Sequence, residues 1–221
     1  MDEVIEVGIS NIEQADILKK SLRAEHFKAI IGEKKLLGDI VYVRAGHGFP
    51  MKYQGQIGKE HYFFKVRDMN LGLNTPIMNV PDNTISEQDR IDIKGKLHKK
   101  NTVIFPKVGA AIATEKKRIL GTDALVDNNI MGLTVKDETL LPPIYLLEIM
   151  EAISLSEIAN AGTVPSINAQ IIKNIQITLP QKSLIYDYLN KMRFINTMLA
   201  DALSHCCSNK NLNNSLINKV F

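Results

Sequence analysis

Alternating apolar and polar residues mark a strand in the last third of the chain. From Ile171 to Leu179 the chain is rich in isoleucine, and Ile175, Ile177 and Leu179 alternate with polar side chains. This period of two predicts a half-buried strand over residues 171–179. The strand is predicted to end at Pro180, because proline cannot donate a hydrogen bond to a strand ladder.

After the proline, the apolar spacing changes to that of a helix. Apolar residues lie four, three, four and three positions apart, at Tyr188, Met192, Ile195, Leu199 and Ala202. This heptad spacing predicts a helix that continues to about residue 206, on the order of 35 to 40 Å long. The apolar seam needs a partner surface, which is either another chain or the helix's own domain.

The N-terminal part of the chain predicts a second helix. Ser10 and Glu13 have the spacing of a capping box, so the helix is predicted to begin at Ser10 and to end near Glu25 or Phe27. Its apolar stripe consists of Ile12, Ala15, Leu18 and Leu22. Residues 1–9 are expected to form a short strand or a tail. A side-by-side arrangement of the two terminal helices is a hypothesis about the topology.

The middle of the chain predicts mostly strands and loops. The expected elements are a strand pair or kinked strand at 35–43 with Gly38 at the bend, strands at 62–66, 101–108 and 130–135, a loop at 74–89, a hairpin with its tip at 115–118, and a helix at 142–156. The pattern predicts an α+β fold, with a mixed β-rich body and a long C-terminal helix. The expected domains are a helical segment at 1–33, the body at 34–180 and the helix at 181–221.

Positive charge is concentrated in one stretch, although the whole chain is only mildly basic. The net charge of the 221 residues is +3 and the sequence pI is about 8.7. Eight lysines and arginines lie between Lys94 and Arg118, and Glu115 is the one acidic residue among them. A one-sided basic field of this kind favours a phosphate backbone as ligand, and a solvated lysine face is the alternative.

Several function classes lack the residues that their chemistry requires. Residues 141–145 (LPPIY) only superficially resemble the motif of an adenine methyltransferase, because Leu141 offers no acceptor to a flipped base. A nuclease would need clustered carboxylates, and Pro81-Asp82 has no matching Glu-x-Lys segment. The sequence contains no P-loop. None of the five histidines has the spacing of a metal site or a triad: His26, His47, His61, His98 and His205.

Three further features concern location and cofactors. The chain has no apolar run of about 18 residues and its N-terminus is acidic, so neither a membrane span nor a secretory signal is expected. Its two cysteines, Cys206 and Cys207, are adjacent and cannot form a framework disulfide. We therefore expect a cytoplasmic protein without a thiolate zinc site, another metal or a cofactor.

The order of loop, polar strand, Leu-Pro and long helix resembles the end of a target recognition domain in the DNA specificity subunit of type I restriction-modification systems. The matching segments are GTVPSIN (162–168), IQITLP (175–180) and the helix from Gln181. The start of that domain resembles residues 37–40 with Gly46. Lys107 with Gly109, and the asparagines before residue 130, also fit the family's pattern. The family's Glu-Gln pair after the proline is replaced here by residues 181–184, QKSL.

This resemblance implies a non-catalytic protein that binds double-stranded DNA in a sequence-specific way. It would direct a modification methyltransferase subunit and a restriction (motor) subunit to the target. A complete specificity subunit has two recognition domains and two spacer helices, whereas this chain shows no internal repeat and has room for one of each. A half subunit would be expected to form a homodimer, which restores the two-fold symmetry.

The candidate DNA-binding residues fall into three groups. Basic residues could donate to guanine: Arg44, Lys107, Lys116, Lys117 and Arg118. Amide side chains could pair with adenine: Gln54, the neighbouring Gln56, Asn128 and Asn129. The third group includes Thr163, Ser166 and Asn168, which could hold phosphates and set the register. It also includes two donors of the glycine-rich loop, Lys52 and His47, and His47 could donate to a phosphate or a base.

Two other classes stay open. The first is an enzyme domain, such as a methyltransferase fragment or a nuclease accessory domain. The second is a protein-interaction scaffold built on the C-terminal helix. In the DNA-binding interpretation the same helix is the arm that docks a methyltransferase partner or a second copy, and its candidate contact residues are those of the apolar seam, from Tyr188 to Ala202.

Overall fold

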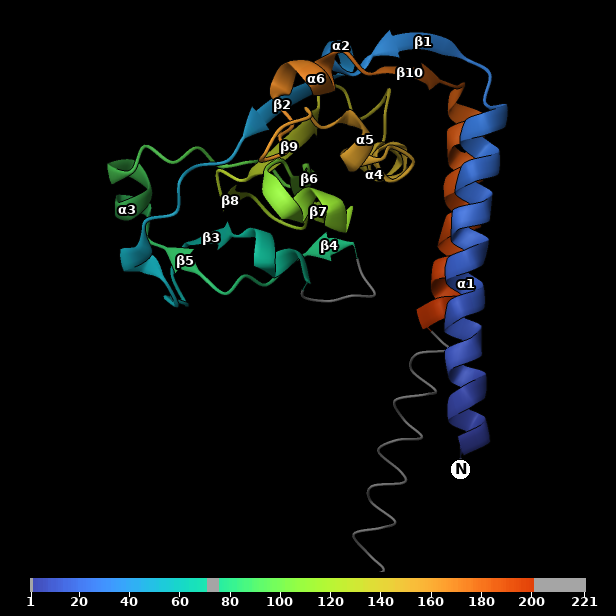
Figure 1. Cartoon of the computed structure of the whole chain (residues 1–221), viewed down its shortest axis with the longest axis horizontal. Helices are drawn as coiled ribbons and strands as arrows, with labels where there is room; N and C mark the ends of the chain where they lie inside the picture. The colour runs from blue at the N-terminus through green and yellow to red at the C-terminus, as the bar shows by residue number, and fades with distance from the viewer. Residues whose placement is uncertain (1, 71–75, 201–221) are drawn as a thin grey trace, which may run out of the picture. The chain divides into compact units, whose positions relative to one another are not determined.

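The computed structural model describes residues 2–70 and 76–200, with side chains from residue 13 onward in the first helix. Two compact units divide the chain. One unit contains the segments up to Ile31 and from Pro180 onward, and the other comprises Gly32–Leu179. The observed mixture of helices and sheets, with a long helix near the C-terminus, confirms the predicted α+β class (Figure 1).

The first unit is a pair of helices. Helix α1 (Asp2–Ala29) and the 182–200 helix run antiparallel, drawn blue and orange-red in Figure 1. The rings of His26 and Tyr188 stack with their centroids 4.1 Å apart, and Phe27 meets Tyr188 edge-on at 5.9 Å. The hypothesis that the terminal helices lie side by side is therefore correct.

The predicted start of α1 is wrong, because the helix begins at Asp2 and continues through Ser10. The residues before Ser10 include no proline, so nothing in their covalent geometry stops the helix there. The predicted C-terminal helix is confirmed to residue 200. Ala202, His205 and the two cysteines lie outside the described residues.

The second unit contains three small sheets. The strands are β1 (Glu33–Leu36), β2 (Val41–Ala45), β3 (His61–Phe64), β4 (Ile77–Met78), β5 (Thr84–Ile85), β6 (Val103–Pro106), β7 (Arg118–Leu120), β8 (Ala124–Val126), β9 (Ile130–Val135) and β10 (Gln176–Leu179). The largest sheet has the order β2-β9-β6-β7-β4, a second has the order β5-β3-β8, and β1 pairs with β10. Most pairs are antiparallel, whereas β3 with β8 and β4 with β7 are parallel.

Short helices connect these strands. They are α2 (Leu37–Ile40), α3 (Glu87–Asp92), α4 (Pro143–Glu151), α5 (Leu155–Ile158) and α6 (Ala169–Lys173), with 3-10 turns η1 (Met51–Tyr53), η2 (Val66–Asn70) and η3 (Gly109–Thr114). Each of α3, α5 and α6 begins at a side chain that accepts a hydrogen bond from the backbone three residues later. These capping residues are Ser86, Ser154 and Asn168.

Four predicted elements need correction. Residues 171–173 belong to helix α6, so the strand of this region begins only at Gln176. Between β1 and β2 the chain forms the helical turn α2, and Gly38 is needed there because a Cβ would come within 2.9 Å of the Lys173 Cβ. The predicted 142–156 helix is two helices, α4 and α5. The predicted 74–89 loop contains β4, β5 and the start of α3.

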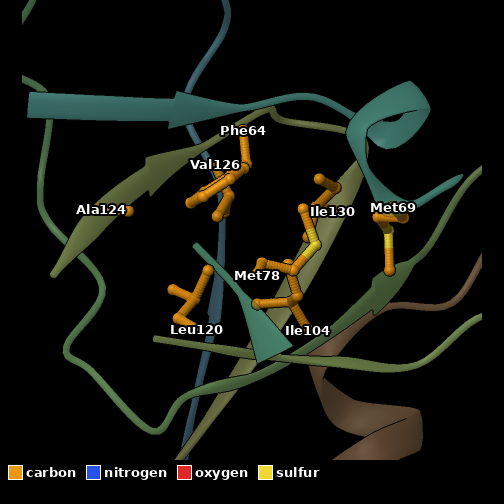
Figure 2. Packing of buried hydrophobic residues seen from close by; sticks show 8 residues of the cluster. All are labelled: Phe64, Met69, Met78, Ile104, Leu120, Ala124, Val126 and Ile130. Carbon is orange, nitrogen blue, oxygen red and sulfur yellow. The ribbon is translucent and has the colours of Figure 1, made fainter. Parts of the chain in front are cut away.

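The core of the second unit lies between its two larger sheets. Figure 2 shows side chains from β3 and β8 gathered with side chains from β4, β6, β7 and β9. The cluster consists of Phe64, Met69, Met78, Ile104, Leu120, Ala124, Val126 and Ile130, all of them buried. The predicted strands at 101–108 and 130–135 contribute to it as β6 and β9, and their short apolar runs are what a buried strand requires.

Candidate nucleic-acid interface

Four segments from different parts of the chain meet beside the β8–β9 turn. The backbone amides of Gly46 and His47 donate to the carbonyls of Ile130 (3.0 Å) and Val126 (2.8 Å). The Lys107 amide donates to the carbonyl of Asn129 at 2.8 Å. The backbone carbonyl of Lys107 accepts a hydrogen bond from the Ile167 amide at 2.9 Å. We call the resulting group of segments 46–47, 107–109, 127–130 and 165–168 the junction.

The β8–β9 turn presents two asparagine side chains. The carboxylate of Asp127 accepts from the Asn129 amide at 2.7 Å, and the Ile130 amide donates to the Asp127 carbonyl at 2.9 Å. Asp127 is buried, whereas Asn128 and Asn129 are exposed. The turn is therefore fixed from inside, while both amide groups face solvent. Two predicted adenine-binding candidates thus stand next to Lys107.

The loop at 162–168 joins the junction through its backbone. Ser166 forms isolated β-bridges with Val108 and with Asn160, and the Gly109 amide donates to the Pro165 carbonyl at 2.8 Å. Thr163 is exposed and Ser166 is half-buried. The side-chain oxygen of Asn168 accepts from the Ile171 amide at 2.9 Å and so caps α6. Asn168 is exposed, and its amide nitrogen is the group that this cap leaves for a ligand.

Arg44 lies on β2 opposite Gly132 of β9 and is partly buried. Its guanidinium donates to the Leu97 carbonyl at 2.5 Å, and burial lowers the pKa of the guanidinium. The hydrogen bond from Arg44 to Leu97 therefore links β2 to the segment before His98. The Arg44 guanidinium would have to give up this bond to make the predicted contact with guanine.

The predicted exposed tip at 115–118 is wrong. The 3-10 turn η3 ends at Thr114 and β7 begins at Arg118, and between them the side chain of Lys117 is 2% exposed. The Lys117 ammonium donates to the Glu115 carboxylate at 2.8 Å and to the Ile153 carbonyl at 3.0 Å. Lys117 therefore lies in the interior, because Glu115 offers it a partner there. It is excluded from the exposed donors.

Glu115 links two connections of the fold. Besides binding Lys117, its carboxylate accepts from the amides of Leu155 (2.8 Å) and Ser156 (2.9 Å) at the start of α5. Burial alone would raise the pKa of Glu115, but the bonds from Lys117 and from the two amides outweigh it and hold the pKa at about 2. Glu115 is thus a structural anion, and the stretch of basic residues around it is not one exposed face.

The neighbours of Lys117 are also engaged in the protein. Lys116 donates to the side chain of Asn70, and it is half-buried. Arg118 donates to the Lys117 carbonyl at 2.8 Å, and burial lowers the pKa of its guanidinium. These two residues stay candidates, but their contacts do not connect them with the junction.

Lys52 and Gln54 lie in the segment from Gly48 to Glu60, which directly follows residues 46–47, the first segment of the junction. Lys52 is exposed, and its ammonium lies 4.6 Å from the ring centroid of Tyr53. The Gln54 amide donates to Asn83 at 3.1 Å and accepts from Lys65 at 2.8 Å. The structure therefore brings together His47, Lys107, Asn128, Asn129 and Ser166, whereas Lys52 and Gln54 occupy a separate loop.

Neither a metal-binding cluster nor a membrane-spanning helix is found in the part of the chain that the structure describes. From residue 13 to 70 and from 76 to 200, His, Cys, Asp and Glu side chains form no group of three that could hold a metal ion. Every helix within residues 2–70 and 76–200 is too short or too polar to span a bilayer.

The sequence of the whole chain matches a known protein family. A sequence profile of the type I restriction modification DNA specificity domain matches residues 11–197, which is most of the chain. The chain belongs to this family. The resemblance of the 162–180 segment to a target recognition domain is thereby confirmed. A search of curated protein sequences found no match.

Solved structures similar to this specificity-domain chain have the same fold at low sequence identity. One is the HsdS subunit from Thermoanaerobacter tengcongensis, with a TM-score of 0.67 and 15% identity, and the match covers 100% of this chain and 54% of that chain. Another comes from work on complex assembly and conformational transition of the type I R-M system, with a TM-score of 0.67 and 14% identity over 99% of this chain and 55% of that chain. The chain thus spans about half the length of these similar proteins.

Two residues that organise the junction were not among the predicted site residues. Gly46 allows the 46–47 segment to approach the β8–β9 turn, since a Cβ there would lie 2.1 Å from the Asp127 carbonyl oxygen. Asp127 fixes the turn through the amide of Asn129. The Asp-Asn-Asn sequence was a signal for a side-chain-bonded turn, because aspartate often accepts from the backbone two residues later.

Proposed function

We propose that this chain is a non-catalytic, sequence-specific double-stranded DNA-binding protein, one half of a type I specificity subunit. The observation that carries the proposal is the junction, in which the sequence-predicted residues from four segments are held together by backbone hydrogen bonds. Membership in the specificity-domain family supports the same reading of these residues. The proteins that act on the DNA would be a modification methyltransferase subunit and a restriction subunit.

In the proposed mechanism the junction enters the major groove. The amides of Asn128 and Asn129 have the donor and acceptor pair that matches the N6 and N7 edge of adenine. Lys107 offers a cation to a phosphate or to guanine, and His47, Thr163 and Ser166 hold phosphates that set the register. Since the backbone of the junction is already fixed, little conformational entropy is lost when these side chains bind.

Replacement of Lys107 with glutamate tests this proposal. Charge reversal at one phosphate contact is expected to weaken binding to random duplex DNA about thirtyfold at low salt and to reduce the salt slope by about one. Gel shifts over a salt series measure both quantities. Lys34→Glu on β1 is the control for the charge change, which is equal at the two positions, although Lys34 is exposed and Lys107 is half-buried. Equal binding by both variants would remove Lys107 from the interface.

The two helices of the first unit are proposed to form the docking arm. Tyr188, Met192 and Ile195 of the predicted seam are at most 5% exposed, and Leu199 is half-buried. Tyr188 packs on His26 of the same chain, so this part of the seam packs against helix α1. The apolar side chains left for a partner lie elsewhere on the helix, with Phe194 67% and Met198 53% exposed.

The docking proposal predicts the effect of charges on this face. Phe194→Glu combined with Met198→Glu is expected to weaken association with a cognate modification subunit, or with a second copy, at least tenfold, because both anions would have to be desolvated. Light scattering with and without that subunit measures the association. Tyr186→Glu with Leu184→Glu, on exposed positions at the start of the helix, shows whether any added charge has the same effect. An unchanged complex in the first variant would contradict this role for the face.

The exposed apolar positions also favour a second candidate, a protein-interaction scaffold without DNA binding. Gel shifts at low salt that show no duplex binding, even with the modification subunit present, would support the scaffold. Transfer of a labelled methyl group to DNA by the chain alone would instead favour an enzyme domain.

A further inference from the structure

The loop from Gly48 to Glu60 is held rigidly by a buried polar anchor. Asn83 is 0% exposed, and its side-chain oxygen accepts from the amide of Gly55 at 2.8 Å and from Gln54 at 3.1 Å. Thr84 adds three bonds. Its amide donates to the Gln56 carbonyl at 2.6 Å, its hydroxyl donates to the same carbonyl at 3.2 Å, and the hydroxyl accepts from the Lys59 amide at 2.9 Å. The loop is therefore tied at its middle and at its end to residues 83–84, at the start of β5.

Two aromatic residues fix the first half of the same loop. Tyr53 is 3% exposed and belongs to a cluster with Phe63, Ile85 and Leu125. Phe49 packs edge-on against Phe63 with a centroid distance of 4.8 Å, and the Lys65 ammonium lies 4.5 Å from the Phe49 ring centroid. Because both aromatic rings point inward, the backbone between them has little freedom.

The loop exposes apolar side chains where polar ones would be expected. Met51 is 71% and Ile57 is 72% exposed. The amides that could recognise a base edge are already bonded within the protein. Gln54 bonds to Asn83 and Lys65, and Gln56 donates to the Lys52 carbonyl at 3.2 Å. What this rigid loop offers to a ligand is thus two apolar side chains beside the exposed cations of Lys52 and Lys59.

We propose that Met51 and Ile57 recognise the C5-methyl groups of thymine, with Lys52 and Lys59 on the adjacent phosphates. This inference rests on the proposed DNA-binding function and specifies one base that the target contains. The thymine methyl is the apolar group on the base edges of the major groove, so it is the feature that an apolar side chain can distinguish there. The rigid backbone favours such a contact, because a positioned side chain loses little entropy on binding.

Selection of duplexes from a random pool tests the inference with the chain itself. The wild-type protein and the variant Met51→Ala with Ile57→Ala are each used to select binding sequences. The wild-type motif is expected to contain thymine at positions where the variant shows no preference, and the variant is expected to bind the wild-type motif about tenfold more weakly. Val80→Ala with Ile144→Ala, at exposed apolar positions of the same unit, is the matched control and should select the wild-type motif.

Uracil substitution then isolates the methyl group. Uracil in place of each selected thymine is expected to weaken wild-type binding about three- to fourfold per methyl and to leave binding by the double variant unchanged. An equal effect of uracil on both proteins, or a wild-type motif without thymine, would overturn the inference while leaving DNA recognition in place. An insensitivity to uracil combined with increased fluorescence of 2-aminopurine in the site would replace it with side-chain insertion between bases. A wild-type protein that selects no motif would remove the proposed function and this inference with it.

Discussion

Replacing Gly46 with alanine is expected to destabilise the second unit by about 4 kcal/mol. A Cβ at this position would lie 2.1 Å from the Asp127 carbonyl oxygen and 2.2 Å from that of Val126. Both are backbone atoms that are fixed by neighbouring strands, so neither can move as the end of a flexible side chain would. The clash would separate the 46–47 segment from the β8–β9 turn and break the bonds from Gly46 to Ile130 and from His47 to Val126.

Thermal unfolding followed by circular dichroism measures this effect. The midpoint is expected to fall by on the order of 10 °C, since about 2 to 4 °C is lost per kcal/mol in a domain of this size. Gly48→Ala is the matched control, because nothing lies within 4 Å of a Cβ built there and its backbone has no positive φ. The close approach would be disproved as a determinant of stability if the two variants melted at the same temperature.

The elements predicted correctly are those with a strong local pattern. The four-three spacing from Tyr188 predicts the 182–200 helix, and the short apolar runs before Pro106 and after Asn129 predict β6 and β9. These patterns work because one buried face or one buried run decides the structure of each element. The 171–173 segment has the same isoleucines as a strand, but Asn168 caps a helix there and overrides the strand preference.

Among the candidate site residues, exposure to solvent could be predicted from the sequence only where a local pattern decides it. Asn128 and Asn129 lie in a turn that the sequence itself indicates. The environment of Lys117 depends instead on Ile153, 36 positions away, and that of Gln54 depends on Asn83, 29 positions away. A single sequence gives no signal for such pairings, so it predicts a surface lysine and a free amide where the fold has internal bonds.

His98 is expected to make the protein unstable in mild acid. It is 1% exposed, and burial is the main reason that its pKa falls to about 4, with the nearby positive charge of Arg44 as the second cause. A hydrogen bond with the backbone of Ala45 acts in the opposite direction and is outweighed. The imidazole therefore stays neutral in the folded protein at pH values where the unfolded chain already binds a proton.

The direction of the pH effect follows from this difference in proton binding. Above about pH 6.5, the ordinary pKa of histidine, neither state is protonated and the stability is fully present. As the pH falls from 6.5 to about 4, the unfolded state alone gains the proton, so the free energy of unfolding decreases by on the order of 3 kcal/mol. Below about pH 4 the folded state also takes up the proton, and the loss from His98 is complete.

Urea denaturation between pH 7 and 4, compared with the variant His98→Gln, isolates this contribution. Glutamine is polar but has no charge at any of these pH values, so the other titrating groups cancel in the difference between the two proteins. The difference in the free energy of unfolding is expected to shift in favour of the variant as the pH falls, with most of the change between 6.5 and 4. A difference that stays constant over this range would mean that His98 binds its proton equally well in both states, and the acid sensitivity would then have to come from the carboxylates.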